Sequence, residues 1–69
     1  MNYIIRGDKM KLWDFYYDFM ERFEGKYELE VYDLNCETTF TIPYIPREIW
    51  NKKVQSFCID KHILKVRVK

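Results

Sequence analysis

Cys58, Asp60 and His62 occupy alternate positions near the end of the sequence and include the groups of a cysteine nucleophile with its base. A tight turn at residues 60–61 would let Cys58 and His62 approach each other across two strands. The sequence supplies neither a helix N-terminus that would activate the thiol nor an evident group that would stabilise an oxyanion. We therefore expect a structural role for this cluster, no catalytic residues and no enzymatic activity.

Cys36 joins Cys58 and His62 as a third soft metal ligand. Zinc sites commonly contain closely spaced pairs such as Cys-x-x-Cys or His-x-x-x-His, and the sequence has neither, so we expect no metal ion and no other cofactor. Two cysteines are too few for a disulfide scaffold and no secretory signal is evident, which favours reduced thiols in a cytoplasmic protein over a bridge between Cys36 and Cys58. No run approaches the roughly 18 apolar residues of a membrane span.

Basic side chains are concentrated in residues 49–69, which contain six of them against one acidic residue. Every second residue of a predicted strand near the end of the chain is basic, and such a row could follow a phosphate backbone. Trp50 or Tyr44 could then provide a platform on which bases stack. The candidate nucleic-acid-binding residues are Lys52, Lys53, Lys65, Arg67 and Lys69.

Acidic residues dominate the preceding segment, because residues 21–48 contain seven of them against three basic residues. Glu28 and Glu30 fall on the solvent side of another predicted strand, so they could pair with the basic strand, each pair contributing about 0.2–1 kcal/mol. The formal net charge of +1 is also low for a domain built to hold nucleic acid. These observations favour paired or solvated charges, and a nucleic-acid groove stays the alternative.

Apolar and aromatic residues cover an unusually wide arc of the helix that the sequence predicts over residues 9–24. At about 100° per residue, one set forms an ordinary core-facing stripe: Leu12, Phe15, Tyr16, Phe19 and Phe23. A second set extends the arc by roughly another 120°, beyond the width that one core contact needs: Met10, Trp13, Tyr17 and Met20. Asp8 suits the N-cap of this helix, and Gly25 suits the position that follows its end.

Two interpretations of the second set are open. The N-terminal arm, residues 1–9, and the connector at residues 43–50 could fold over it and complete the core of a monomer. Alternatively, the set docks on a second copy of the chain or on another protein, since aromatic residues and methionine are enriched at interfaces and small proteins gain stability by assembling. We favour an interface, as a homodimer or higher oligomer. Its predicted residues are Met10, Trp13, Tyr17, Met20 and Trp50.

Alternating apolar positions predict strands on both sides of a proline-containing connector. Together with the amphipathic helix they predict a single α+β domain: a four-stranded antiparallel sheet made of two hairpins, one long helix packed on a face, and a short connecting helix that begins at Pro46. The predicted elements are an arm or extra strand over residues 1–9, the long helix over 9–24, a first hairpin over 26–42, the short helix over 46–52 and a second hairpin over 54–68, within one domain of residues 1–69.

From Met10 onward the chain resembles a group of very small proteins from phages and mobile elements of Firmicutes. The helix here is longer and more aromatic than in that group, and residues 1–9 are additional. No active-site residue is implied, because the matching positions are core and turn residues. The motifs that carry the resemblance are Met10-Lys11-Leu12, Glu30-Val31-Tyr32-Asp33, the strand at residues 38–42, Ile45-Pro46, Lys53-Val54 with Phe57 and Ile59, and the strand at residues 64–68.

Some proteins of this kind inhibit host defence systems, including CRISPR systems, and others resemble small coactivators that bind single-stranded DNA and assemble through their helices. The resemblance implies a phage- or mobile-element-derived interaction protein in the cytoplasm of a host cell. We therefore expect an oligomeric, anti-CRISPR-like inhibitor of a host defence protein. A single-stranded nucleic-acid-binding module is the first alternative, and a sponge for a nucleotide signal at an oligomer interface is the second.

Overall fold

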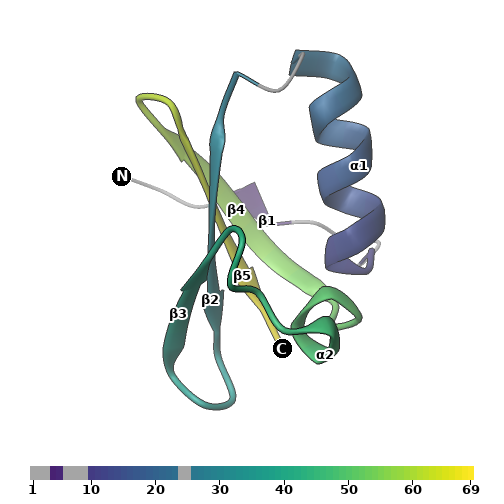
Figure 1. Cartoon of the computed structure of the whole chain (residues 1–69), viewed down its shortest axis with the longest axis vertical. Helices are drawn as coiled ribbons and strands as arrows, with labels where there is room; N and C mark the ends of the chain where they lie inside the picture. Colours follow the sequence, from purple (N-terminus) through teal and green to yellow (C-terminus); the bar gives the residue numbers. More distant parts are fainter. Residues whose placement is uncertain (1–3, 6–9, 24–25) are drawn as a thin grey trace.

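A computed structural model describes residues 4–5, 10–23 and 26–69 of the chain. In this part of the chain the structure combines two helices with one sheet, as the sequence predicts for an α+β protein (Figure 1). In chain order they are β1 (Ile4–Ile5), α1 (Leu12–Phe23), β2 (Glu28–Asp33), β3 (Thr38–Thr41), α2 (Arg47–Trp50), β4 (Val54–Asp60) and β5 (Ile63–Val68).

The strands form one sheet in the order β1-β4-β5-β2-β3. β2 pairs with β3 and β4 pairs with β5, both antiparallel, so the two predicted hairpins are present. The hairpins join through β2 and β5, which run parallel with Val31 opposite Val66. The sheet is therefore mixed, and the prediction of an antiparallel sheet is wrong. Alternation of apolar residues indicates which face of a strand is buried, but it does not indicate the direction of the neighbouring strand.

α1 is shorter than the predicted long helix, since it begins at Leu12, ends at Phe23 and has 12 residues. The chain just before it forms an extended bridge, in which Lys11 lies opposite Lys53. The Leu12 N–H donates to the carbonyl of Lys52 at 2.8 Å. Backbone hydrogen bonds to the segment before β4 therefore replace the predicted first turn, and helical periodicity alone does not reveal such a tertiary contact.

Three smaller predictions concern the N-terminal arm, the short helix and the caps of the long helix. β1 pairs antiparallel with β4, with Ile4 opposite Phe57, so the N-terminal arm contributes an additional strand. α2 lies within the short helix predicted over residues 46–52. The predicted cap residues Asp8 and Gly25 lie outside the described residues.

β4 contains a β-bulge at Gln55. Because of this extra residue, Val54 and Phe57 both face the core although they are three positions apart. Before the bulge Val54 lies opposite Val68, and beyond it Phe57 lies opposite Val66, so β4 contains one residue more than β5 over this stretch. A bulge of this kind leaves one residue unpaired and bends the strand. The sheet curves accordingly.

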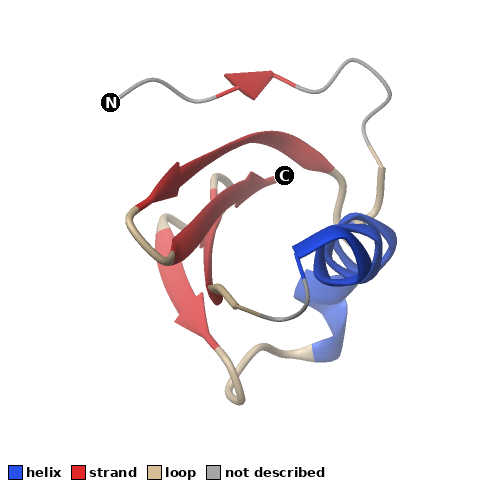
Figure 2. Ribbon diagram, turned by 90° about the horizontal axis from the view of Figure 1, so that it is seen from above, coloured by secondary structure: helices blue, strands red, loops and turns tan. Residues whose placement is uncertain are grey.

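The core lies inside this curved sheet, and α1 lies across the open side (Figure 2). Taking an aliphatic or aromatic side chain of this kind out of water contributes about 1.5–3 kcal/mol. The buried apolar side chains are Leu12, Phe15 and Phe19 of α1, Leu29 and Val31 of β2, Ile45 and Ile49 around α2, Val54 of β4, and Leu64, Val66 and Val68 of β5.

Candidate interaction surface

α1 turns one face to the core and a different, aromatic one to solvent. Trp13 and Tyr17 are 56% and 61% exposed, although Leu12 beside them is fully buried. Residues four apart are neighbours on a helix surface, so the two rings stand on consecutive turns. With Trp50 of α2 they form a surface that we call the aromatic face.

α2 holds Trp50 against this surface. Its first turn begins after Pro46, whose φ of −62° is already that of a helix start, and the N–H groups of Ile49 and Trp50 donate to the Pro46 carbonyl at 3.0 and 3.3 Å. Ile49 is buried and anchors the helix in the core. The Trp50 ring then meets Trp13 edge to face, with centroids 5.2 Å apart and planes at 84°. Such a pair contributes about 0.5–1.5 kcal/mol beyond area burial.

The structure brings together only part of the predicted interface set. Met10 and Met20 are half-buried, and Met10 packs against the core. Trp50 is half-buried between Trp13 and Tyr16, whose ring centroid is 5.6 Å away. The connector therefore covers one edge of the surface, as the monomer interpretation expects, while the rings on α1 itself stay open to solvent.

A hollow of about 500 Å³ lies beside Trp13 and Trp50. Two polar residues and two tryptophans line it, which makes the hollow suitable for a side chain or a ring from a partner. Its lining consists of Trp13, Ile45, Arg47, Trp50 and Asn51.

Two of the predicted nucleic-acid-binding residues are engaged in ion pairs. The Lys65 ammonium lies 4.0 Å from a Glu30 carboxylate oxygen and 3.5 Å from one of Asp60, so the expected pairing of charge across neighbouring strands is confirmed for Lys65 and Glu30. Lys52 donates to Asp33 at 2.6 Å.

The other three predicted nucleic-acid-binding residues, Lys53, Arg67 and Lys69, are exposed. Of the two predicted stacking platforms, Tyr44 is 79% exposed, whereas Trp50 is half-buried. The predicted set therefore contains two lysines paired with carboxylates and three exposed basic side chains.

A buried polar cluster around Asp33 was not predicted. The carboxylate accepts hydrogen bonds from the Lys52 ammonium, from the Cys36 thiol at 3.1 Å and from the Asn35 N–H at 2.9 Å. The Lys52 hydrogen bond is the main cause that lowers the pKa of Asp33, outweighing burial, which raises it. Aspartate is typical of turns, and residues 33–36 suit one by composition. The alternation of Leu29 and Val31 nevertheless continues to Asp33, and it is the signal of the inward position of this residue.

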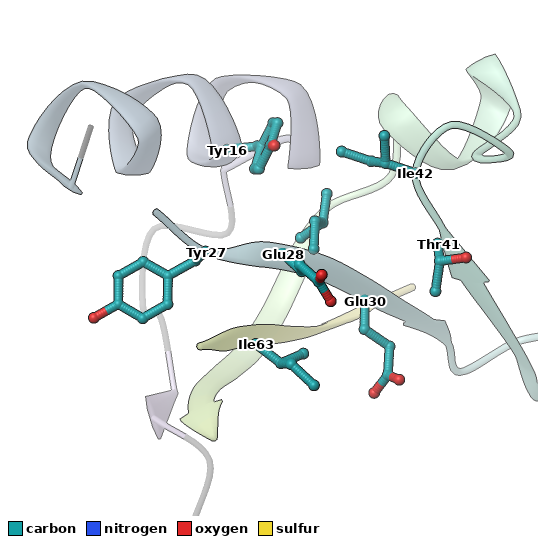
Figure 3. A pocket seen from close by; sticks show the side chains of 8 residues that line it. Tyr16, Tyr27, Glu28, Glu30, Thr41, Ile42 and Ile63 are labelled. Carbon is teal, nitrogen blue, oxygen red and sulfur yellow. The ribbon is translucent and has the colours of Figure 1, made fainter. Parts of the chain in front are cut away.

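A second hollow, of about 460 Å³, lies below the start of α1 (Figure 3). Tyr16 reaches it from α1, Glu28 and Glu30 from β2, and Ile42 from beyond β3. Burial raises the pKa of the Tyr16 phenol, which therefore stays protonated at neutral pH. The lining contains no basic residue, and the Glu28 carboxylate repels an anionic ligand, so this hollow does not suit the predicted nucleotide signal.

The cysteine, aspartate and histidine near the end of the chain do not converge. Cys58 is buried and lies opposite Lys65 in the β4–β5 hairpin, while His62 is exposed in the turn. The expected approach of Cys58 to His62 is therefore wrong. Cys36 is a free, exposed thiol, and no group of three histidine, cysteine or acidic residues suited to a metal ion occurs within the described ranges.

None of the helices formed by the described residues is both long and apolar enough to span a membrane. Comparison with known proteins finds no matching family model, no similar curated protein and no similar solved structure.

Proposed function

We propose that this chain is an interaction protein that acts by contact, and that it assembles with a second copy of itself through the aromatic face. The observation that carries the proposal is the exposure of Trp13 and Tyr17 on consecutive turns of a helix whose opposite side is anchored in the core. Large exposed aromatic side chains in one patch are typical of interface centres. A small domain also gains stability when a partner covers such a patch.

A second copy suits this face because twofold pairing is the commonest form of assembly and lays the two aromatic faces directly against each other. With the twofold axis perpendicular to α1, the two helices run antiparallel. Their dipoles are then opposed, which is favourable.

Light scattering after size exclusion tests the assembly. The chain is expected to elute with the mass of a dimer, and Tyr17→Glu is expected to elute as a folded monomer because a carboxylate cannot be buried unpaired. Tyr44→Glu is the matched control, since Tyr44 is 79% exposed and is not one of the three residues of the aromatic face. It should leave the dimer intact.

A monomeric wild type, or a Tyr17→Glu variant that stays dimeric, would contradict the proposed assembly. Circular dichroism of each variant separates a lost interface from a lost fold. Because Tyr17 does not contribute to the core, the variant should keep the wild-type spectrum.

The resemblance to small phage and mobile-element proteins supports a narrower proposal, that the assembled protein inhibits a host defence protein in the cytoplasm. Its test is the plating efficiency of a phage on cells that carry a defined defence system, with and without expression of the chain. Restored plating is expected with the wild type and not with Tyr17→Glu. Unchanged plating across a panel of defence systems would count against inhibition and leave the assembly itself unaffected.

A further inference from the structure

The bridge before α1 sets two lysines directly opposite each other, Lys11 and Lys53. Its hydrogen bonds come from the flanking residues, since the N–H groups of Leu12 and Val54 donate on either side of the pair at 2.8 and 2.7 Å. This is the narrow kind of antiparallel pair, with Cα atoms about 4.5 Å apart and both side chains on one face. The two lysine side chains therefore leave the backbone side by side and toward the same face.

Lys69 extends this pair on the other side of Lys53. Val54 lies opposite Val68, and the Lys69 N–H donates to the Lys53 carbonyl at 3.1 Å, so the two lysines are the next partners along the strands. Both valines are buried, which places the lysines on the outer face. All three lysines are exposed, and the start of α1 and the end of β5 meet at the same end of the molecule, beside α2 (Figure 1). We call Lys11, Lys53 and Lys69 the lysine row.

The lysine row departs from the charge pattern of the rest of the sheet. Like charges directly opposite each other destabilise a sheet, and elsewhere on it Lys65 is matched by Glu30 and Asp60. In the part of the chain that the structure describes, no carboxylate forms an ion pair with the lysine row. Real proteins break such local rules mainly at functional sites.

We propose that the lysine row binds the phosphate backbone of a single-stranded nucleic acid, a function beyond the proposed self-assembly. The row spans about 10 Å across three chain segments, and Arg67 lies on the same face, two residues or about 7 Å along β5. A linear set of cations matches a linear polyanion better than a compact anion. The row itself contains only lysines, whereas binding to an anionic membrane uses an apolar contact as well as charges.

Fluorescence anisotropy with a labelled single-stranded oligonucleotide tests the proposal. If the three lysines neutralise three phosphates, log K should fall with log salt at a slope of about −2, so affinity should drop about 20-fold between roughly 50 and 200 mM salt. The double variant Lys53→Gln with Lys69→Gln should reduce that loss to about threefold and weaken binding at low salt. The control is Lys26→Gln with Lys61→Gln, which removes the same charge from two exposed lysines outside the row.

Equal effects of the two double variants would overturn the proposal, because binding would then follow net charge alone. So would the absence of oligonucleotide binding at low salt, or binding of anionic phosphatidylserine vesicles in its place. The single variant Lys11→Gln provides a third measurement on a separate chain segment, and it should lower the salt slope by about 0.7. A cooperative melting transition at or above the wild-type temperature would show that each variant is folded.

Discussion

Lys52 Nζ lies 2.6 Å from Asp33 Oδ2, and the Asp33 residue is 1% exposed. The same carboxylate oxygen accepts the Cys36 thiol, and the other oxygen accepts the Asn35 N–H. Asp33 ends β2, whereas Lys52 lies between α2 and β4. One buried carboxylate therefore fastens the turn of the first hairpin to the segment that leads into the second.

Asp33→Asn should lower the free energy of unfolding by about 3 kcal/mol, because it leaves the partly buried Lys52 ammonium without its counter-charge. Urea denaturation followed by circular dichroism measures the change. The control is Asp18→Asn, which removes the exposed pair between Asp18 and Arg22 at 3.2 Å and should cost no more than about 0.5 kcal/mol. If the free energy of unfolding falls equally in the two variants, the buried ion pair contributes no more to stability than the exposed one.

Stability should also fall at acid pH through the same carboxyl group. The pKa of Asp33 is lower in the folded chain than its ordinary value of about 3.9, chiefly because of the hydrogen bond from Lys52. Its contribution is therefore fully present above the unfolded pKa and is lost as the pH falls below about 4. Melting temperatures at a series of pH values should decline more steeply for the wild type than for Asp33→Asn. If the melting temperatures of the two proteins fall equally with pH, other carboxylates cause the loss of stability in acid.

Asp33 also marks the boundary of what the sequence reveals. Leu29 and Val31 show a period of two that correctly predicts a half-buried strand, and a third inward position follows from the same period. A charged side chain at that position nevertheless favours a turn over a buried strand end. Its burial depends on the Lys52 partner, which lies 19 residues further along the chain. A local sequence pattern does not predict an ion pair between residues so far apart in the chain.

The same limit explains the sheet and the helix. Val66 and Val68 alternate with polar residues whether β5 runs parallel or antiparallel to β2, so the direction of pairing was open. The aromatic face was predictable in part: the helical period separates Trp13 and Tyr17 from the core stripe. The pairing of Lys11 with Lys53 was not predictable, since it depends on where the chain enters α1.

Phe19→Ala should lower the free energy of unfolding by about 3–5 kcal/mol, the usual cost of removing a buried aromatic ring. Phe19 is 6% exposed, and its ring lies 6.2 Å from that of Phe15 and 5.4 Å from that of Tyr27. Phe23, in contact with it at 4.5 Å, is 40% exposed, so Phe23→Ala is the control with a smaller loss. Chemical denaturation ranks the two variants, and the reverse order would contradict the core described above.

The two thiols should react at very different rates. Cys36 is exposed and Cys58 is 3% exposed, and neither forms a disulfide. A thiol reagent should modify Cys36 in the native chain, and Cys58 only when the β4–β5 hairpin opens. We expect Cys58 to be modified at least about 100-fold more slowly than Cys36, which corresponds to a free energy of roughly 3 kcal/mol for opening the hairpin. Mass spectrometry counts the modified thiols over time. Cys36→Ser should abolish the fast phase, whereas two equal phases in the wild type would contradict the burial of Cys58.

Lys53→Glu should stabilise the fold even though it removes a surface cation. The new carboxylate would lie between Lys11 and Lys69, so two repulsive cross-strand pairs become attractive, each worth about 0.2–1 kcal/mol. We expect a gain of about 1 kcal/mol in the free energy of unfolding at low salt, which shrinks as salt screens the charges. Lys26→Glu makes the same change of charge outside the lysine row and should leave stability nearly unchanged. If the free energy of unfolding rises equally in both variants, the increase comes from the change in net charge. The lysines of the row would then not destabilise the fold by repelling one another. A gain confined to Lys53→Glu, together with loss of oligonucleotide binding, would show that the row lowers stability and serves a function.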